Sequence, residues 1–217
     1  MGTGATRSAA AGAPRTPRRR ATDPAPGAAD TPDLQALLAE REALRRELEE
    51  AKAQISQLER LADEDALTPI ANRRAFVREL TRMIAFTKRY GVPSSVVYFD
   101  VNGMKQINDN HGHLAGDAAL RLVAKTLLDN VRSSDVVGRL GGDEFGVILA
   151  HTNEDQAKNK AEALSDALVA APLRWGGVDI RVSAAHGVYA FTANDDPQVA
   201  IESADRAMYR QKRAPAR

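Results

Sequence analysis

The chain has 217 residues, 43% of them apolar and 27% charged, which suffices for one well-packed domain with appendages but hardly for two full domains. The formal net charge of +1 excludes an overall field that would attract nucleic acid or an anionic membrane. Cysteine is absent, which excludes disulfides and thiolate metal sites, and neither an apolar run of about 20 residues nor a secretory pattern occurs, so we expect a cytoplasmic location.

Residues 1–30 are expected to form a disordered basic tail. Ala, Pro, Arg, Gly and Thr dominate this segment, and large apolar side chains are almost missing. Such a segment buries too little surface to offset the entropy lost on ordering. We interpret the run Arg18-Arg19-Arg20 as a solvated part of the tail, with contact to an acidic partner as the alternative.

Residues 31–64 carry a heptad repeat that predicts a parallel, dimeric coiled coil. The segment from Asp33 to Asp65 contains no Gly or Pro, and apolar residues recur at two seam positions over four heptads. The a positions are Leu34, Arg41, Leu48, Ile55 and Ala62, and the d positions are Leu37, Leu44, Ala51 and Leu58. The alternative is a single amphipathic helix that lies on its own domain.

Charges beside the seam favour the parallel arrangement. Glu40 and Glu47 fall at g positions, and Arg45 and Lys52 fall at the following e positions. In a parallel dimer these positions face each other across the seam with opposite sign. Each exposed pair contributes little by itself, yet together they favour the in-register homodimer.

Residues 65–217 alternate between helical and strand patterns, which predicts an α+β domain. We expect strands at 94–101, 136–140, 145–149 and 179–190, and helices around 76–87, 120–131, 154–170 and from Asp196-Pro197 onward. Gly141-Gly142 is suited to a tight hairpin turn between the two middle strands. This order predicts a ferredoxin-like, split βαβ sheet of antiparallel type with helices packed on one face.

Three acidic residues lie where a core strand or turn gains nothing from charge. Asp100 ends an apolar strand, and Asp143-Glu144 leaves the glycine turn. If the first strand pairs beside the hairpin, the three carboxylates meet at one edge of the sheet. Hard oxygen ligands suit Mg²⁺, which usually completes its shell with substrate phosphates. The pattern therefore predicts a nucleotide-binding metal site, and glycines without Cβ atoms let the backbone approach the substrate closely.

Four ordered motifs resemble the GGDEF, or diguanylate cyclase, family. The motifs are Asp65-Ala66-Leu67-Thr68-Pro69-Ile70-Ala71-Asn72-Arg73-Arg74, Phe99-Asp100-Val101-Asn102-Gly103-Met104-Lys105, Asn108-Asp109-Asn110-His111-Gly112-His113 with Gly116-Asp117, and Arg139-Leu140-Gly141-Gly142-Asp143-Glu144-Phe145. The resemblance covers about residues 65 to 213. It implies a fold similar to nucleotidyl cyclases and polymerase palm domains, and an enzyme that condenses two GTP molecules into cyclic di-GMP and two pyrophosphates across a homodimer.

The resemblance also implies a role for each matching position. Two Mg²⁺ or Mn²⁺ ions per half-site are expected on Asp100, Asp143, Glu144 and the Val101 carbonyl, with Asp143 or Glu144 as the candidate base. Asn102, Gly103, Met104, Gly141 and Gly142 would lie against the substrate, while Lys105 and Lys212 would neutralise the triphosphate. Asn108 and Asp117 match the residues that recognise guanine. A carboxylate can accept hydrogen bonds from the N1–H and the N2 amino group of guanine at the same time.

Plainer interpretations exist for several of these residues. Asp117 could cap a helix that starts at Ala118, Asn108 and Asp109 could be turn residues, and Lys212 could complement a helix dipole.

Arg132 and Asp135 stand at the spacing of the family's R-x-x-D site for product inhibition. The plainer interpretation is an arginine at a helix end followed by a turn aspartate. The family often adds an arginine from the helix after the hairpin, where this chain has only Lys158 and Lys160.

The chain departs from the family pattern at three places. Pro69 replaces a usual glycine, Asn102 stands where many members have a second aspartate, and a closing G-R-N is missing. The leading alternative to the enzyme is a degenerate domain that senses cyclic di-GMP through Arg132 and Asp135, although the intact motif Gly141-Gly142-Asp143-Glu144-Phe145 argues against it. A coiled-coil scaffold is the third interpretation.

Overall fold

The structure is a computed structural model that describes residues 31–213. The predicted tail 1–30 and residues 214–217 lie outside the described residues. The chain divides into two compact units, one up to Lys52 and one from Ala53 onward.

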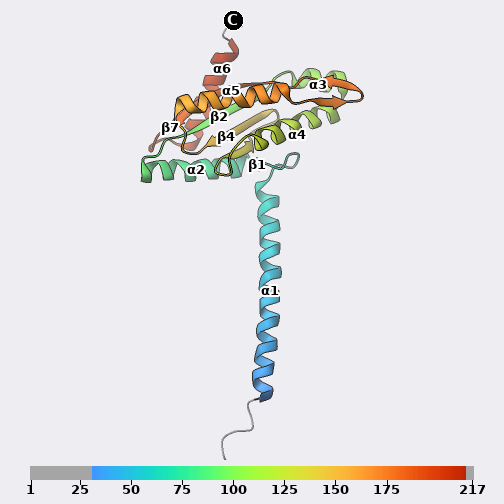
Figure 1. Ribbon diagram of the computed structural model, residues 1–217, viewed down its shortest axis with the longest axis vertical. Helices are drawn as coiled ribbons and strands as arrows, with labels where there is room; N and C mark the ends of the chain where they lie inside the picture. The colour runs from blue at the N-terminus through green and yellow to red at the C-terminus, as the bar shows by residue number, and fades with distance from the viewer. Residues whose placement is uncertain (1–30, 214–217) are drawn as a thin grey trace, which may run out of the picture. The chain divides into compact units, whose positions relative to one another are not determined.

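The heptad segment forms one helix, α1 (Thr31–Asp63) (Figure 1). Six large residues of the predicted seam are more than half exposed along it, namely Leu34 (59%), Leu37 (57%), Leu44 (58%), Leu48 (53%), Ile55 (56%) and Leu58 (64%). Lys52 pairs with Glu49 on the same helix at 3.0 Å. The expected long helix is confirmed, and its pairing with a second copy stays a prediction.

The second unit contains a five-stranded sheet in the order β1-β3-β4-β2-β7. Its strands are β1 (Ala71–Asn72), β2 (Ser94–Val101), β3 (Val136–Arg139), β4 (Glu144–Leu149) and β7 (Ala184–Phe191). The long central strand β2 pairs antiparallel with β4 and β7, and only the short β1 runs parallel to its neighbour β3. The predicted α+β sheet of antiparallel type is confirmed.

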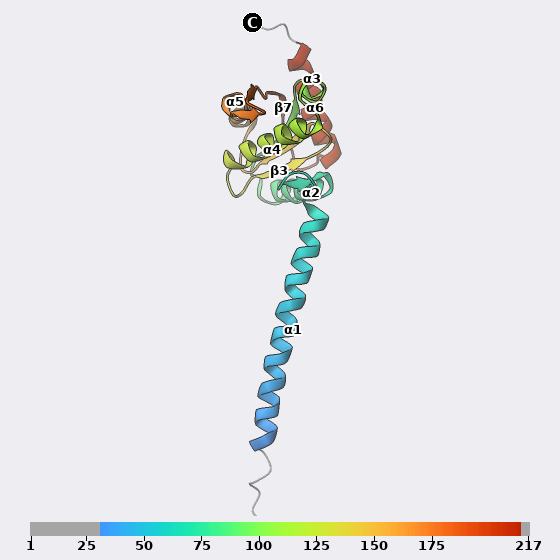
Figure 2. The same ribbon diagram turned by 90° about the vertical axis from the view of Figure 1, so that its right-hand side faces the viewer.

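Helices cover both faces of this sheet rather than the single face expected from the sequence (Figure 2). On one face lie α3 (Met104–His111), α4 (His113–Asp129) and α5 (Glu154–Ala170), and on the other lie α2 (Arg73–Tyr90) and α6 (Pro197–Arg213). In β2, Val97 and Phe99 belong to the first core, while Val96 and Tyr98 belong to the second. A continuous apolar run is typical of such burial on both sides.

Two parts of the domain differ from the sequence-based expectation. The strand expected at 179–190 is divided into β6 (Val178–Ile180), which forms a small hairpin with β5 (Leu173–Trp175), and the longer β7. The hairpin turns at Gly176 and Gly177, whose positive φ angles of 56° and 85° favour glycine. The segment after β2, read only as a turn with following loop residues, forms helix α3.

Glycines let helices approach the second face of the sheet closely. Gly138 and Gly146 are cross-strand partners, and a Cβ atom on either would lie within 2.7 Å of the Phe76 ring of α2. At Gly187 a Cβ atom would meet backbone atoms of α6. These contacts seat α2 and α6 directly on the strands.

Within residues 31–213 no helix is both long enough and apolar enough to span a membrane.

Candidate active site

The pairing of β2 with β4 brings the predicted acidic residues to one edge of the sheet. Asp100 and Glu144 are direct cross-strand partners. Just beyond this pair, the Val101 amide donates a hydrogen bond to the Asp143 carbonyl oxygen at 3.0 Å. The end of β2 and the glycine turn are therefore fastened to each other by backbone contacts.

A cavity of about 530 Å³ opens at this edge. Eight of the residues predicted from the sequence line it: Asp100, Val101, Asn102, Gly103, Met104, Lys105, Asp143 and Lys212. Asp100 and Asp143 thus line the same cavity and do not lie on opposite sides of the sheet. Gln106 and Asp109 also line it, and the sequence analysis did not single them out as site residues.

The start of α3 supplies free backbone donors to this cavity. Gly103 stands before the helix in the left-handed conformation, with a φ of 69°, and no side chain caps the first turn. Uncapped N–H groups at a helix start carry a partial positive charge and bind anions such as phosphate. Because Gly103 and Met104 themselves line the cavity, these donors are available to an anionic ligand there.

Two lysines add positive charge to the same cavity. The Lys212 ammonium of α6 forms an ion pair with Asp100 across 112 residues of sequence. Lys105 is exposed at the first turn of α3. Lys212 therefore acts through a specific contact, in addition to its place near the end of α6, where a basic residue suits the helix dipole.

The donors fit a divalent cation of the magnesium type. Among residues 31–213, no three His, Asp or Glu side chains gather into a ready-made metal cage. Two carboxylates, Asp100 and Asp143, nevertheless line one cavity beside the Val101 backbone. Mg²⁺ is commonly held by one or two carboxylates, with water and substrate phosphates completing its shell. Such a donor set suits an ion that is bound together with its substrate.

Glu144 lies differently from the two aspartates. It does not line the cavity, and its carboxylate lies over Gly141, where a Cβ atom would be 2.2 Å from Oε2. Burial raises the pKa of Tyr98, and the hydrogen bond with Glu144 raises it further. The predicted metal and catalytic roles of Glu144 stay predictions.

The turn itself is not the two-residue hairpin expected. Residues 140–143 form the loop between β3 and β4, closed by a hydrogen bond of 2.8 Å from the Leu140 amide to the Glu144 carbonyl oxygen. Neither Gly141 nor Gly142 has a positive φ. A Cβ atom on Gly142 would meet nothing within 4 Å, so this position leaves open space for a ligand.

Asn108 and Asp117 lie on neighbouring helices outside the cavity lining. The Asn108 side chain packs against Gly116, the residue before Asp117, so closely that a Cβ atom there would clash with its amide. Both plainer interpretations are wrong, because Asn108 and Asp109 belong to α3 and because α4 begins at His113, well before Asp117. Their role in guanine recognition stays a prediction.

The R-x-x-D segment lies just before β3. Asp135 accepts hydrogen bonds from the Arg132 amide at 3.0 Å and from the Ala150 amide at 3.1 Å, so it also stabilises this turn. Arg132 and Asp135 line a cavity of about 330 Å³ together with Lys160 of α5. The Lys160 ammonium donates to the Asn130 carbonyl.

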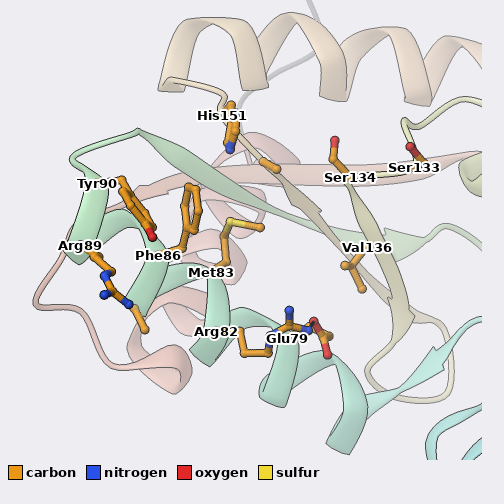
Figure 3. Close-up of a pocket in the computed structure, with 12 residues that line it drawn as sticks. Glu79, Arg82, Met83, Phe86, Arg89, Tyr90, Ser133, Ser134, Val136 and His151 are labelled. Atoms are coloured by element: carbon orange, nitrogen blue, oxygen red, sulfur yellow. Dashed lines mark hydrogen bonds and ion pairs between the residues drawn. The ribbon is translucent and has the colours of Figure 1, made fainter.

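A second cavity of about 600 Å³ adjoins this segment, and the sequence analysis missed it (Figure 3). Ser133 and Ser134 line one side, and residues of α2, among them Arg82, Phe86 and Arg89, line the other. His151 lines both cavities. Its ring stacks on Phe86 with centroids 5.5 Å apart and 12° between the planes. The signal available in the sequence was the run of basic and aromatic residues at the end of α2.

Comparison with known proteins places these features in a family. The family model of the diguanylate cyclase GGDEF domain matches residues 62–217. Diguanylate cyclase DgcP of Pseudomonas aeruginosa is 36% identical over 169 residues, which are 76% of this chain and 25% of that protein. Diguanylate cyclase DosC of Escherichia coli is 40% identical over 150 residues, 69% of this chain and 33% of that protein. The chain thus spans about a quarter to a third of these relatives.

Solved structures show the same fold. The coiled coil and GGDEF domain of DgcB from Caulobacter crescentus, solved in complex with c-di-GMP, superposes with a TM-score of 0.73 at 27% identity, covering 83% of this chain and 94% of that one. The diguanylate cyclase SiaD of Pseudomonas aeruginosa, solved with its activator SiaC, gives a TM-score of 0.71 at 27% identity, covering 84% and 70%. With the family model matched over most of its length, this chain belongs to the GGDEF diguanylate cyclase family.

Proposed function

We propose that the protein is a diguanylate cyclase that condenses two GTP molecules into cyclic di-GMP and two pyrophosphates. The observation that carries the proposal is the shared cavity, in which Asp100 and Asp143 meet the uncapped start of α3 and Lys212. This combination offers carboxylates for divalent cations and donors for phosphates in one place. The activity of the similar cyclases supports the same substrate.

Each domain supplies half of the complete active site, and each half-site binds one GTP. Asp100, Asp143 and the Val101 carbonyl would hold two Mg²⁺ or Mn²⁺ ions, which stabilise charge on the phosphoryl oxygens and favour the ionised hydroxyl. The amides at the start of α3 donate to the phosphates, and Lys105 and Lys212 neutralise the triphosphate. Asn108 and Asp117 read the guanine edge. Recognition of this kind disfavours ATP, because adenine would leave a polar carboxylate unpaired.

Two half-sites must meet for the reaction to finish. The 3′-hydroxyl of each ribose attacks the α-phosphorus of the other GTP, its proton is removed, and the bond to the β-phosphate oxygen breaks to release pyrophosphate. Asp143 is the better candidate base, because it lines the cavity whereas Glu144 is engaged by Tyr98. Asp143 can accept the proton only when its carboxylate is near the hydroxyl in the bound complex.

A parallel coiled coil of two α1 helices would supply the second half-site. The exposed seam supports this pairing, since leucines that stay half exposed on one helix are buried when two helices meet. Tethering raises the effective concentration of the partner domain to about the millimolar range. Replacing a seam residue, Leu44→Glu, is expected to make specific activity fall steeply on dilution, while Glu42→Gln, outside the seam, leaves it unchanged.

One assay separates the enzyme from its rivals. Purified protein is incubated with GTP and Mg²⁺ beside Asp143→Ala, and cyclic di-GMP is measured by mass. The cyclase forms product only with the wild-type chain. A sensor binds cyclic di-GMP without turnover, and a scaffold does neither. If Asp143→Ala forms cyclic di-GMP at the wild-type rate, the proposed role of Asp143 in the reaction is refuted.

Product inhibition is proposed at the R-x-x-D segment. An arginine fork recognises a phosphate or the edge of guanine, and Arg132 lines a cavity large enough for part of such a ligand. Arg82 and Arg89 in the adjoining cavity offer planar guanidinium forks, and Phe86 offers an aromatic ring, which Lys158 and Lys160 lack. Arg132→Ala is expected to raise the inhibition constant of cyclic di-GMP, whereas Arg121→Ala, an exposed arginine of α4, leaves it unchanged. An unaltered inhibition constant in Arg132→Ala contradicts the assignment.

A further inference from the structure

Two residues of the family motifs, Asp65 and Arg139, have no part in the chemistry proposed above. They lie 74 residues apart in sequence and form an ion pair, with Nη1 of Arg139 3.0 Å from Oδ1 of Asp65. The Arg139 side chain is only 14% exposed and the Asp65 side chain only 19%. Because the pair is largely shielded from water, it differs from the surface ion pairs that contribute little. A contact of this kind between distant segments can hold one of them in place.

The guanidinium of Arg139 also binds the glycine turn, Gly141-Gly142. Its Nε donates to the carbonyl oxygens of Gly141 at 3.1 Å and Gly142 at 3.2 Å, and Nη2 donates to Gly142 at 2.7 Å. One planar group therefore holds Asp65 on one side and two consecutive carbonyls of the turn on the other. The fixed geometry of the guanidinium fork converts these contacts into a defined spacing.

Asp65 is itself held firmly. Its Oδ1 accepts hydrogen bonds from the Thr68 hydroxyl at 2.7 Å, the Thr68 amide at 3.0 Å and the Leu67 amide at 3.1 Å. Burial alone would raise the pKa of Asp65, but the hydrogen bonds from Thr68 and Arg139 outweigh burial and hold that pKa below its usual value. The carboxylate thus stays ionised at neutral pH, as a fixed anchor for the arginine.

Backbone hydrogen bonds hold the two ends of the turn, at Leu140 and Asp143, and Arg139 adds a hold on the two glycines between them. Gly141 and Gly142 have no side chains that could pack, glycine has the largest backbone freedom, and Asp143 follows them directly. On the basis of the proposed function, we propose that Arg139 is a positioning residue of the active site. Anchored on Asp65, it holds the glycine carbonyls and so sets the place of the Asp143 carboxylate in the cavity.

A neighbouring ion pair provides a matched control. Arg78 of α2 forms a two-point pair with Asp63 at 3.0 and 2.8 Å, two residues before Asp65. This pair also fastens the start of the domain, and it joins two segments that lie outside the glycine turn. Loss of this pair weakens the start of the domain, whereas loss of Arg139 also releases the carbonyls of Gly141 and Gly142.

The test uses the full chain with Arg139→Gln, Asp65→Asn, the double variant and Arg78→Gln. Binding of Mn²⁺ is measured without nucleotide from the electron paramagnetic resonance signal of the free ion, and kcat and KM for GTP are measured separately. Arg139→Gln is expected to weaken Mn²⁺ binding about tenfold and to lower kcat about 10- to 100-fold, since small misplacements of a catalytic group cost this much. KM for GTP changes by no more than about twofold, because the phosphate and guanine contacts remain.

The two partners should act as one unit. Asp65→Asn is expected to change Mn²⁺ affinity in the same direction, and the double variant to be no worse than Arg139→Gln, because coupled residues are not additive. Thermal unfolding checks that each variant is folded, and Asp65→Asn decides the question if Arg139→Gln does not fold. Wild-type Mn²⁺ affinity in both folded variants, additive losses, or an equal loss in Arg78→Gln each overturns the positioning role.

Failure of the proposed function gives a different result. If the wild-type chain binds Mn²⁺ and loses affinity on Arg139→Gln but makes no cyclic di-GMP, the cyclase activity is refuted and the positioning role stands. If the wild-type chain binds no Mn²⁺ either alone or with GTP and makes no cyclic di-GMP, both are overturned. If it makes cyclic di-GMP but binds Mn²⁺ only together with GTP, the kcat values of the variants decide the positioning role.

Discussion

The close packing of α6 against β7 can be tested by the substitution Gly187→Ala, which adds one methyl group between them. A Cβ atom at Gly187 would lie 2.1 Å from the Met208 amide nitrogen and 2.2 Å from the Ala204 carbonyl oxygen. Both are backbone atoms, so no side-chain rotation relieves the clash. To restore an ordinary contact of 3.4 Å, the helix must retreat by about 1.3 Å, the difference from the present 2.1 Å. Gly187→Ala therefore displaces α6 rather than a single side chain.

The expected loss of stability follows from this displacement. Overpacking of a core costs roughly 1–3 kcal/mol, and a clash between backbone atoms belongs at the upper end, about 3 kcal/mol. For a chain of this size each kcal/mol lowers Tm by about 2–4 °C, so Gly187→Ala is expected to lower Tm by about 6–12 °C. Activity should fall as well, because α6 carries Lys212, which pairs with Asp100.

Calorimetry and urea unfolding measure this change, with turnover assayed well below Tm. Gly142→Ala is the control for stability, because its added methyl group meets no atom within 4 Å. The control should change the free energy of unfolding by no more than about 0.5 kcal/mol. A Gly187→Ala variant with the Tm of the wild-type chain would refute the close seating of α6.

Three further changes test the site and the core. Lys212→Gln removes the ammonium that pairs with Asp100, so Mn²⁺ binding without nucleotide should strengthen while kcat falls; weaker Mn²⁺ binding contradicts the ion pair. Asp117→Asn should raise KM for GTP by about 10- to 100-fold, the usual effect of losing a charged hydrogen bond, and steady-state kinetics with an unchanged KM would exclude guanine contact. Burial lowers the pKa of His186 from its usual 6.5, so the unfolded chain binds more protons and stability falls as pH drops below this value. Urea unfolding between pH 7 and 5 should show this slope and its loss in His186→Gln.

The fold was predictable wherever local signals agree with tertiary packing. Gly91, with a φ of 67°, ends α2 where the Gly-x-Pro pattern indicated, and β2 has the bounds 94–101 that its apolar run gave. The continuous apolar run of β2 is typical of burial on both faces, but the expectation of helices on one face was taken from the order of the elements instead. Helix α3 was missed since only eight residues form it and just Met104 and Ile107 are buried, too few for a clear period.

The site was predictable as a set of residue types but not as a network. The motifs and the order of the strands sufficed to predict that Asp100 and Asp143 lie close together, and both line one cavity. Neither predicts that Glu144 turns toward Tyr98, which depends on which face of β4 each residue occupies. The hydrogen bond from Arg139 to Asp65 joins segments 74 residues apart in the sequence, and a local sequence pattern cannot predict a contact between residues so far apart. Contacts of this kind depend on the packing of the whole domain.

The replacement of an aspartate by Asn102 is consistent with the local hydrogen bonding of this chain. The Asn102 amide donates to the Ser183 hydroxyl at 3.1 Å, and its backbone N–H donates to the Ser183 carbonyl at 2.8 Å. A carboxylate has no proton to donate, so it would have to accept from the serine instead. It would also add a negative charge to a cavity that already holds Asp100, Asp109 and Asp143. Since Mg²⁺ needs only one or two protein carboxylates beside substrate phosphates, Asn102 can reduce repulsion among the carboxylates without removing the donors that the proposed reaction requires.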